Sequence, residues 1–214
     1  MQPCRPNRVF ATSSRITVVY SMARSYKKKR QRNANTAKLR PGLAHLTVRA
    51  RPGHRSQGLL SVCGSVFPCA LGRAGISSSK REGDGATPLA AMRLMSGYYR
   101  SDHANVRAAQ LEMRPIDATL GWCEVPGDRN YNRPVKVPYA ASHETMRRKD
   151  RLYDYCLVLD WNISMRRRGR GSAIFFHLAR PDFSPTQGCV AVTRTVMERL
   201  LPLVSRRTVL TVKR

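Results

Sequence analysis

Acidic residues are missing from the first 81 positions of this chain of 214 residues, in which the first carboxylate belongs to Glu82. The 39 lysines and arginines outnumber the 13 aspartates and glutamates, so the formal net charge is +26. A protein this cationic attracts polyanions, namely nucleic acid, anionic lipid or an acidic cell-wall polymer. The charge therefore predicts nonspecific contact with a polyanion, and it does not select one of these partners.

Long apolar runs are missing as well, and none approaches the roughly 18 to 20 residues that a membrane-spanning helix needs. Residues 15–23 have a basic flank and a short apolar core, but a cationic block at 27–32 follows closely. This pattern is not a convincing secretory signal. The sequence predicts no transmembrane segment, and it leaves export and oligomeric state open.

Metal-ligand spacings are also missing. The six cysteines are scattered, with no Cys-x-x-Cys pair and no cluster of cysteine and histidine. The sequence therefore predicts neither a disulfide framework nor a metal site, and no cofactor is expected. Cys63, Cys69 and Cys156 lie in strand-like runs, where we predict inert, buried thiols.

The chain does contain a basic segment followed by a region of short β-type runs. Residues 1–43 are rich in Arg, Lys, Asn and Ser, and we predict a disordered extension there because the cationic block repels itself. In residues 44–214 apolar runs alternate with loops rich in Gly and Pro, the longest at 72–88 and 121–138. The predicted strands are 46–48, 59–63, 66–71, 92–99, 155–161, 173–178 and 208–212, with a two-residue turn at 64–65.

One helix is clearly indicated near the C-terminus, where Thr193 can cap it and Pro202 lies near its exit. Its apolar side chains recur at helical spacing, at Val196, Met197, Leu200, Leu201 and Val204. Residues 139–151 are interpreted as a second, shorter helix. The predicted fold is mostly β, of a sandwich or barrel type, with one or two peripheral helices and a single core.

The clearest chemical signal is a histidine and a cysteine joined by one short loop. An apolar run at 172–176 ends at His177, and a loop of Pro, Ser, Thr and Gly then leads to Gly188 and Cys189. A nearby imidazole can take the proton of a thiol, and backbone amides ahead of a helix can stabilise an oxyanion. Spacing alone favours the plainer alternative, which is a strand-end histidine and a buried core thiol.

Two separated motifs carry a more specific signal, and the first of them comprises two stretches. Residues 171–177 read Gly-Ser-Ala-Ile-Phe-Phe-His, and residues 185–190 read Pro-Thr-Gln-Gly-Cys-Val. Upstream, residues 80–88 read Lys-Arg-Glu-Gly-Asp-Gly-Ala-Thr-Pro. In this order they resemble the catalytic segment and the Lys-x-x-Gly-Asp-Gly-x-Thr-Pro element of the L,D-transpeptidase (YkuD-like) family of bacterial cell-wall enzymes. The resemblance covers roughly residues 45–213.

The resemblance implies a catalytic domain of the L,D-transpeptidase type at 44–214, with Cys189 as nucleophile and His177 as general base. The amides of Gly188 and Cys189 would face the oxyanion. The implied reaction is acyl transfer from peptidoglycan tetrapeptide stems through a thioester on the enzyme. It would form cross-links, or hydrolyse or exchange the terminal D-amino acid, without a cofactor. The family also implies a location in the periplasm or cell envelope.

The segment around the cysteine departs from the family's common Ser-His-Gly-Cys ending and from the arginine that follows it. Thr186 and Gln187 precede the glycine here, and Ala191 stands in the place of the arginine. These departures bear on substrate choice and carboxylate recognition more than on acyl chemistry. They also leave open a family member that binds peptidoglycan without catalysis.

Substrate contacts are predicted for Gln187 and, in a polar loop, for Asn132 and Arg133, since arginine can bind a carboxylate through two hydrogen bonds. The alternative for this loop, given equal weight, is a solvated turn. Asp84 is predicted to shape a turn, and Trp122, Tyr153 and Trp161 to belong to the core.

A basic nucleic-acid-binding protein is the remaining hypothesis. Its discriminating feature would be aromatic rings interleaved with the basic residues for base stacking, and the tail contains only Phe10, Tyr20 and Tyr26.

Overall fold

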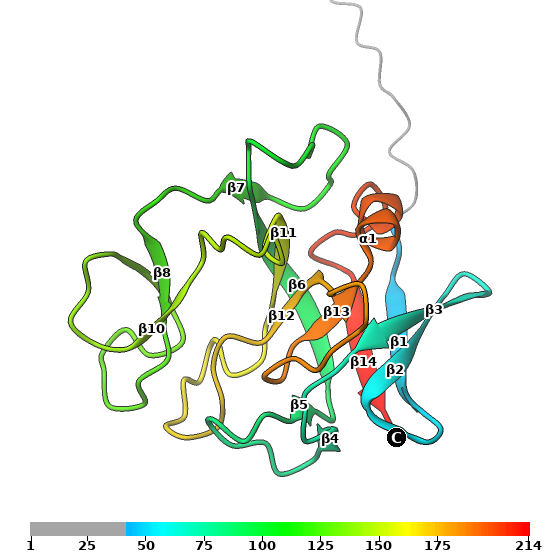
Figure 1. Cartoon of the computed structure of the whole chain (residues 1–214), viewed down its shortest axis with the longest axis horizontal. Helices are drawn as coiled ribbons and strands as arrows, with labels where there is room; N and C mark the ends of the chain where they lie inside the picture. Colours follow the sequence, from blue (N-terminus) through cyan, green and yellow to red (C-terminus); the bar gives the residue numbers. More distant parts are fainter. Residues whose placement is uncertain (1–41) are drawn as a thin grey trace, which may run out of the picture. The chain divides into compact units, whose positions relative to one another are not determined.

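The computed structural model describes residues 42–214, so the extension predicted at 1–43 lies almost entirely outside the described residues. The main sheet has nine strands. They are β1 (His45–Arg51), β2 (His54–Val62), β3 (Ser65–Ala70), β6 (Ala91–Tyr99), β7 (Met113–Pro115), β11 (Tyr155–Leu159), β12 (Phe175–Leu178), β13 (Val190–Val192) and β14 (Val209–Lys213). Their order across the sheet is β11-β12-β13-β3-β2-β1-β14-β6-β7 (Figure 1). The mostly β fold predicted from the sequence is confirmed.

The sheet closes on itself because β6 pairs with β14 on one side and with β11 on the other. Closure pairs the backbone groups that an open edge would expose. The contact between β13 and β3 is the narrowest, with one residue pair, Ala191 and Ala70. A parallel bridge between Gly72 and Thr186 adds a second contact there. The segment that precedes Cys189 is therefore tied to the rest of the barrel.

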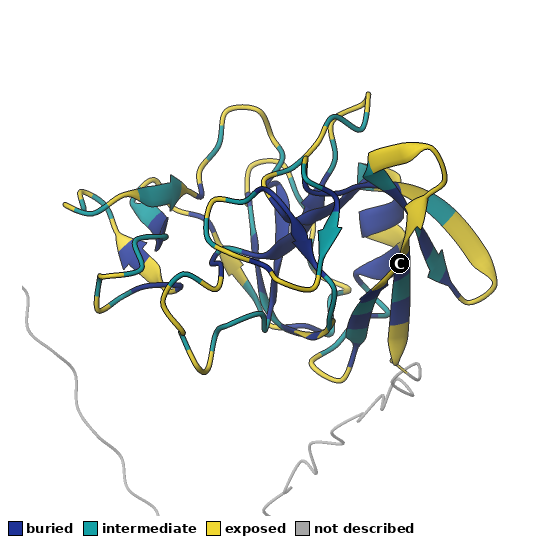
Figure 2. Cartoon of the chain, turned by 90° about the horizontal axis from the view of Figure 1, so that it is seen from below, coloured by how far each residue is buried: buried dark blue, intermediate teal, exposed yellow. Residues whose placement is uncertain are grey.

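The interior of the barrel is filled by alternate side chains of four strands, as expected when one face of a sheet is covered. These residues are Leu46, Val48, Leu60, Val62, Met92, Leu94, Leu210 and Val212. By contrast, β11 and β12 are buried at every position, because they separate this interior from a second apolar cluster. The second cluster contains Tyr98, Ile116, Trp122, Met146, Tyr153, Cys156, Val158, Phe175 and Cys189. Figure 2 shows the buried strands in the middle of the molecule and the exposed loops around them.

The second cluster is covered by a small sheet of β10 (His143–Thr145), β8 (Leu120–Cys123) and β9 (Pro134–Lys136), in that order. From β8, the Trp122 ring meets the Phe175 ring edge to face, with 5.1 Å between centroids. The regions predicted as long loops thus contain short strands, which also include the parallel pair β4 (Ile76–Ser77) and β5 (Thr87–Pro88). Pairing and aromatic contacts with distant residues, which local composition does not show, organise these segments.

The C-terminal helix, α1 (Arg194–Leu200), forms as predicted. The side chain of Thr193 caps it by accepting a hydrogen bond from the amide of Val196 at 3.4 Å. Its buried face consists of Val196, Met197 and Leu200. Among residues 42–214, no helix has both the length and the apolar character needed to cross a membrane.

The second helix predicted at 139–151 is wrong. Three of its residues form β10, which pairs with β8 through His143 and Cys123, and the others follow an irregular path. Met146 is the one fully buried side chain of this segment, so it has no continuous apolar stripe to hold a helix against the core. Its charged side chains instead make ion pairs, including one between Arg148 and Asp150.

The hairpin between β2 and β3 also differs from the prediction. Val62 pairs with Ser65, so the two turn residues are Cys63 and Gly64, and both have positive φ. Cys63 is therefore exposed, and the prediction that its thiol is buried is wrong. Cys69 and Cys156 are buried as predicted.

Candidate active site

The parallel pairing of β12 and β13 brings His177 and Cys189 to one cavity. His177 lies opposite Ala191 in this register, and Cys189 comes one residue before β13 begins. The sulfur of Cys189 accepts a hydrogen bond from the amide of Phe175 at 3.3 Å and donates one to the carbonyl of Ala173 at 3.2 Å. Both His177 and Cys189 line a cavity of about 410 Å³. The backbone thus holds the thiol in the cavity that His177 also lines, and the thiol makes no hydrogen bond to the imidazole.

The backbone that receives the thiol is turned sharply before β12. Gly171 and Ala173 have φ values of 93° and 51°, so the strand predicted from residue 173 begins at Phe175. A Cβ at position 171 would lie 3.1 Å from the Lys80 side chain, which leaves little room for any residue but glycine. This turn directs the carbonyl of Ala173 toward the sulfur of Cys189.

The side-chain amide of Asn132 holds the same turn in place. Its side-chain oxygen accepts hydrogen bonds from the amide of Ala173 and from Nε1 of Trp122, both at 3.0 Å. Its side-chain nitrogen donates to the carbonyl of Trp161 at 3.1 Å. Asn132 is 1% exposed and does not line the cavity, because these three bonds occupy its amide. Asn132 therefore positions Ala173 and does not face the cavity.

The other two predicted substrate contacts are placed differently. Arg133 is exposed and does not line the cavity, since it follows Asn132 on the outer side of the loop that leads into β9. Gln187 is exposed and does line the cavity, immediately before the glycine and the cysteine. The geometry therefore brings one of the three predicted contacts to the cavity wall.

Gly188 is required by both its conformation and its surroundings. Its φ is 137°, and a Cβ at this position would lie 2.8 Å from the carbonyl oxygen of Ala86. Its amide donates to the hydroxyl of Thr186 at 3.1 Å, and that hydroxyl donates to the carbonyl of Cys189 at 2.7 Å. Thr186 therefore holds the turn before the thiol, and it occupies the amide predicted to face an oxyanion.

The sequence element at residues 80–88 contacts this turn through Ala86. As predicted, Asp84 organises the element. Its carboxylate accepts hydrogen bonds from Nζ of Lys80 at 2.6 Å, from the amide of Arg81 at 2.7 Å and from the amide of Ala86 at 2.8 Å. Burial opposes ionisation, but these bonds hold the pKa of Asp84 below its usual value. The two sequence motifs are thus neighbours in space.

The tautomer of His177 follows from one contact. Its Nδ1 lies 2.9 Å from the carbonyl oxygen of Leu178, and a carbonyl can only accept a hydrogen bond. In the neutral imidazole Nδ1 therefore carries the proton, and Nε2 is left as a proton acceptor. This is the form that a general base needs.

Burial determines the charge state of the pair. It lowers the pKa of His177 from 6.5 to about 4 and raises the pKa of Cys189 from 9.0 to about 12. A thiolate and an imidazolium are therefore not the resting forms at neutral pH. The site holds a neutral thiol and a neutral imidazole, and proton transfer has to accompany attack on a substrate.

Tyr153 and Arg148 belong to this site although the sequence did not indicate them. The ring of Tyr153 lies edge to face against the imidazole of His177, with 5.1 Å between centroids. The guanidinium of Arg148 lies over the ring of Tyr153, 5.1 Å from its centroid. Tyr153 was predicted to belong to the core, and it is buried, but it also lines the cavity. No local pattern distinguishes such a tyrosine from other core aromatics.

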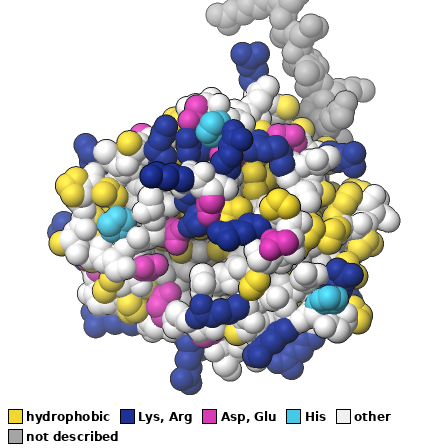
Figure 3. All heavy atoms as spheres, viewed as in Figure 1, with side chains coloured by type: hydrophobic (Ala, Val, Ile, Leu, Met, Phe, Trp, Pro, Cys, Tyr) yellow, Lys and Arg dark blue, Asp and Glu magenta, His cyan; other side chains and the backbone are white. Residues whose placement is uncertain are grey.

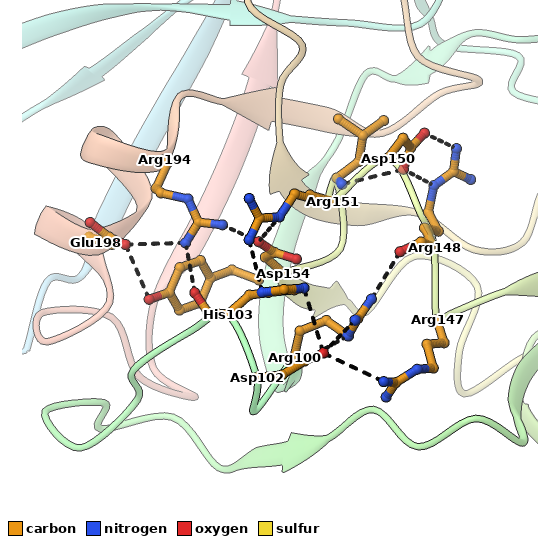
Figure 4. Close-up of polar contacts among 12 residues, drawn as sticks. Arg100, Asp102, His103, Arg147, Arg148, Asp150, Arg151, Asp154, Arg194 and Glu198 are labelled. Atoms are coloured by element: carbon orange, nitrogen blue, oxygen red, sulfur yellow. Dashed lines mark hydrogen bonds and ion pairs between the residues drawn. The ribbon is translucent and has the colours of Figure 1, made fainter.

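Arg148 is part of a wider network of ion pairs (Figure 4). Its guanidinium pairs with Glu144 at 2.7 Å and with Asp150 at 2.6 Å, and its carbonyl accepts a hydrogen bond from Arg100 at 2.9 Å. Figure 4 also shows Asp154 between Arg151 and Arg194, close to the start of α1. The network fixes the loop that carries Arg148 and Tyr153 beside the imidazole.

Basic side chains outnumber acidic ones on the visible face. Figure 3 shows lysines and arginines scattered over this face, with fewer acidic side chains between them. The residues that the structure describes contain no group of three or more histidines, cysteines or acidic side chains placed to hold a metal ion.

The site can be compared with known proteins now that its geometry is described. The sequence model of the YkuD family, the L,D-transpeptidase catalytic domain, matches residues 64–212. No significant match was found among curated proteins or among solved structures. The matched region contains the strands from β3 to β13 and most of β14, both sequence motifs, and His177 and Cys189 of the cavity wall. This chain therefore belongs to the L,D-transpeptidase catalytic domain (YkuD) family.

Proposed function

We propose that this protein is a cysteine-dependent L,D-transpeptidase that acts on the tetrapeptide stems of peptidoglycan. The observation that carries the proposal is that Cys189 and His177 line the same cavity, with Nδ1 of His177 held by the carbonyl of Leu178. Membership of the family supports the reaction class, and the chain supplies the nucleophile and the base that acyl transfer requires.

In the first half-reaction, the sulfur of Cys189 attacks the carbonyl carbon of the amide that follows the diaminopimelate residue of the stem. His177 accepts the thiol proton as the carbon–sulfur bond forms. The tetrahedral intermediate collapses with loss of D-alanine, whose nitrogen receives the proton from His177, and a thioester remains on Cys189. Because the resting thiol has a pKa of about 12, attack and proton transfer to His177 are coupled.

In the second half-reaction, an amine of a neighbouring stem attacks the thioester and gives a cross-link. His177 now takes the proton from the amine and returns it to the departing thiol. Water in place of the amine gives hydrolysis, and a free D-amino acid gives exchange. All three outcomes use one acyl-enzyme in a ping-pong sequence.

Oxyanion stabilisation is assigned to the amides of Gly188 and Cys189. The amide of Gly188 donates to the hydroxyl of Thr186 in the free protein, so substrate binding has to transfer that hydrogen bond to the oxyanion. Gln187, exposed at the cavity wall, is the contact that we assign to the substrate peptide. Asn132 acts through Ala173, by holding the carbonyl that orients the thiol.

The proposal is tested by intact-mass measurement after the full chain is incubated with a purified stem tetrapeptide or with a carbapenem. We expect a covalent adduct on the parent, none on Cys189→Ala, and an unchanged adduct on Cys63→Ala, because Cys63 is exposed on the hairpin turn away from the cavity. A folded parent that forms no adduct with either reagent would contradict the proposal and favour a family member that binds peptidoglycan without catalysis.

A further inference from the structure

Three acidic side chains line the cavity, and two of them have no cationic partner. Glu144 pairs with Arg148 at 2.7 Å. Glu82 accepts a hydrogen bond from the hydroxyl of Tyr131, and Glu124 accepts one from the hydroxyl of Ser142 at 2.7 Å. Neither Glu82 nor Glu124 forms an ion pair with any of residues 42–214.

The cationic side chains of the cavity wall are already neutralised. Lys80 pairs with Asp84 at 2.6 Å, and Arg180 shares Asp150 with Arg148 at 3.2 Å. The charge left uncompensated at the wall is therefore negative, in a chain that has 39 basic and 13 acidic residues. With so many arginines available, two unpaired carboxylates on the wall of this cavity point to a cationic group on the ligand.

A buried hydroxyl adds a further acceptor at the same wall. Ser172 is 7% exposed and lines the cavity, and its Oγ has no hydrogen-bond partner. It lies near the hydroxyl of Tyr131, which donates its own hydrogen bond to Glu82. A buried hydroxyl without a partner lacks the hydrogen bond that a ligand can supply.

Glu82 is held in place before any ligand binds. Its amide donates to the carbonyl of Gly169 at 3.0 Å, and its loop is clamped by Asp84. The hydroxyl of Tyr131, which is 2% exposed, fixes one carboxylate oxygen of Glu82. The orientation of this carboxylate therefore costs little on binding.

We propose that Glu82 and Glu124 form a subsite for the ammonium group of the substrate, with the hydroxyl of Ser172 as a further acceptor. An ammonium group has three N–H donors and no acceptor, which matches two carboxylates and one hydroxyl. The inference rests on the proposed function for the identity of the ligand, which is then a stem peptide whose diamino acid keeps a free side-chain amine. The subsite selects that amine and leaves acyl transfer to Cys189 and His177.

The first test measures binding without chemistry, by calorimetry on the full chain carrying Cys189→Ala. The ligands are a stem tetrapeptide with a free side-chain amine and the same peptide acetylated on that amine. We expect the acetylated peptide to bind about tenfold more weakly, as for a lost charge-assisted contact. Glu82→Gln and Glu124→Gln should each reduce this ratio, because glutamine keeps the shape and the hydroxyl contact but not the charge.

The matched control is Glu112→Gln, which removes the same charge from an exposed ion pair with Arg114 that does not line the cavity. It should leave the ratio unchanged. Equal affinity for the two peptides, or a ratio that Glu112→Gln lowers as much as Glu82→Gln does, would overturn the subsite. Failure of both peptides to bind would overturn it as well.

The second test does not depend on catalysis and uses thiol reagents of different charge on the parent. A cationic and an anionic methanethiosulfonate each convert a thiol to a mixed disulfide, with methanesulfinate as the leaving group. Peptide mapping separates modification of Cys189 from that of exposed Cys63, which reports the field of the cationic protein as a whole. We expect the cationic reagent to be favoured about tenfold more at Cys189 than at Cys63, as for an opposite charge held nearby.

The two proposals fail in different ways. Loss of the charge preference with an intact acyl adduct would overturn the subsite and leave the transpeptidase proposal standing. A preserved preference for the amine in the Cys189→Ala protein, together with no adduct on the parent, would support the subsite and contradict the acyl transfer. Equal preferences at Cys63 and Cys189 would contradict the subsite in either case.

Discussion

At the scale of single residues, the site combines a thiol and an imidazole that are both kept neutral by burial. The residue types and their order in the chain predict the pair, but not its protonation, because the pKa depends on how many neighbours exclude water. Cys189 and His177 are 6% and 4% exposed, so desolvation exceeds the effect of the hydrogen bonds that each makes.

The neutral imidazole of His177 gives a testable dependence of stability on pH. Its pKa is about 4 in the folded protein against 6.5 for a free imidazole. As the pH falls from 6.5 to 4, the unfolded chain gains a proton that the folded chain does not, so stability decreases across this window. The full effect is on the order of 3 kcal/mol. Denaturant unfolding of the parent and of His177→Gln at pH 7 and near pH 4 measures it.

His177→Gln serves as the reference for the parent, since the carboxylates titrate alike in both proteins. We expect the parent to lose more stability than His177→Gln as the pH falls. Equal losses in the two proteins would show that the histidine is hydrated or protonated in the folded state.

The sequence does not show which way a side chain faces, and this is why the roles predicted for two residues differ from those in the structure. Asn132 was predicted to touch substrate because polar loop residues often do, but its amide supports Ala173 instead. Tyr153 was predicted to be core and is also cavity wall. In both cases the deciding contact is with a residue distant in sequence, Ala173 for Asn132 and His177 for Tyr153, so spacing along the chain contains no sign of it.

At the scale of elements, the predicted parts are those with a local signature. The alternating strands β1, β6 and β14 and the capped helix α1 were indicated by period and by cap chemistry. The helix predicted at 139–151 was wrong because that segment is organised by pairing with β8 and by ion pairs of Arg148. The short strands β4, β5, β8 and β9 were missed because they form only against distant partners.

The junction between α1 and β11 depends on one buried carboxylate. Asp154 is 0% exposed and pairs with Arg194 at the first residue of α1, and more distantly with Arg151 at 3.6 Å (Figure 4). We expect Arg194→Met to lower the free energy of unfolding by about 3 to 5 kcal/mol, because it leaves a buried charge poorly compensated. Denaturant unfolding at pH 7 measures the change.

Two further variants check the cause. Asp154→Asn combined with Arg194→Met should recover part of the loss, since the buried charge is then removed. Arg114→Met breaks the exposed pair with Glu112 and should change stability by less than about 1 kcal/mol. A loss for Arg194→Met that Asp154→Asn does not relieve would mean that packing of the arginine stem, and not the charge, is responsible.

At the scale of the whole molecule, the closed sheet creates two apolar clusters, and the site lies where β12 separates them. Phe176 and Leu178 face the barrel interior, whereas Phe175 belongs to the second cluster with Cys189. The sequence predicted a single core, because the apolar residues of β12 form an unbroken run that does not show which side each one faces. The second cluster is covered by the small sheet, which also carries Glu124 and Glu144 to the cavity.

The net charge of +26 predicts how the full chain behaves toward polyanions. Binding to duplex DNA of unrelated sequences should be equal, and its affinity should fall steeply and log-linearly with salt, because counterion release drives it. Adduct formation at Cys189 should change little over the same salt range, since the thiol is buried and the screening length at 0.15 M is about 8 Å. Fluorescence anisotropy with two DNA sequences and intact-mass measurement, both from 0.05 to about 0.5 M salt, test the two statements together. Sequence-selective binding that persists at the highest salt would favour a nucleic-acid-binding protein. Unselective DNA binding that salt weakens, together with an adduct at Cys189 that salt does not affect, would show that the net charge of the chain takes no part in the reaction at Cys189.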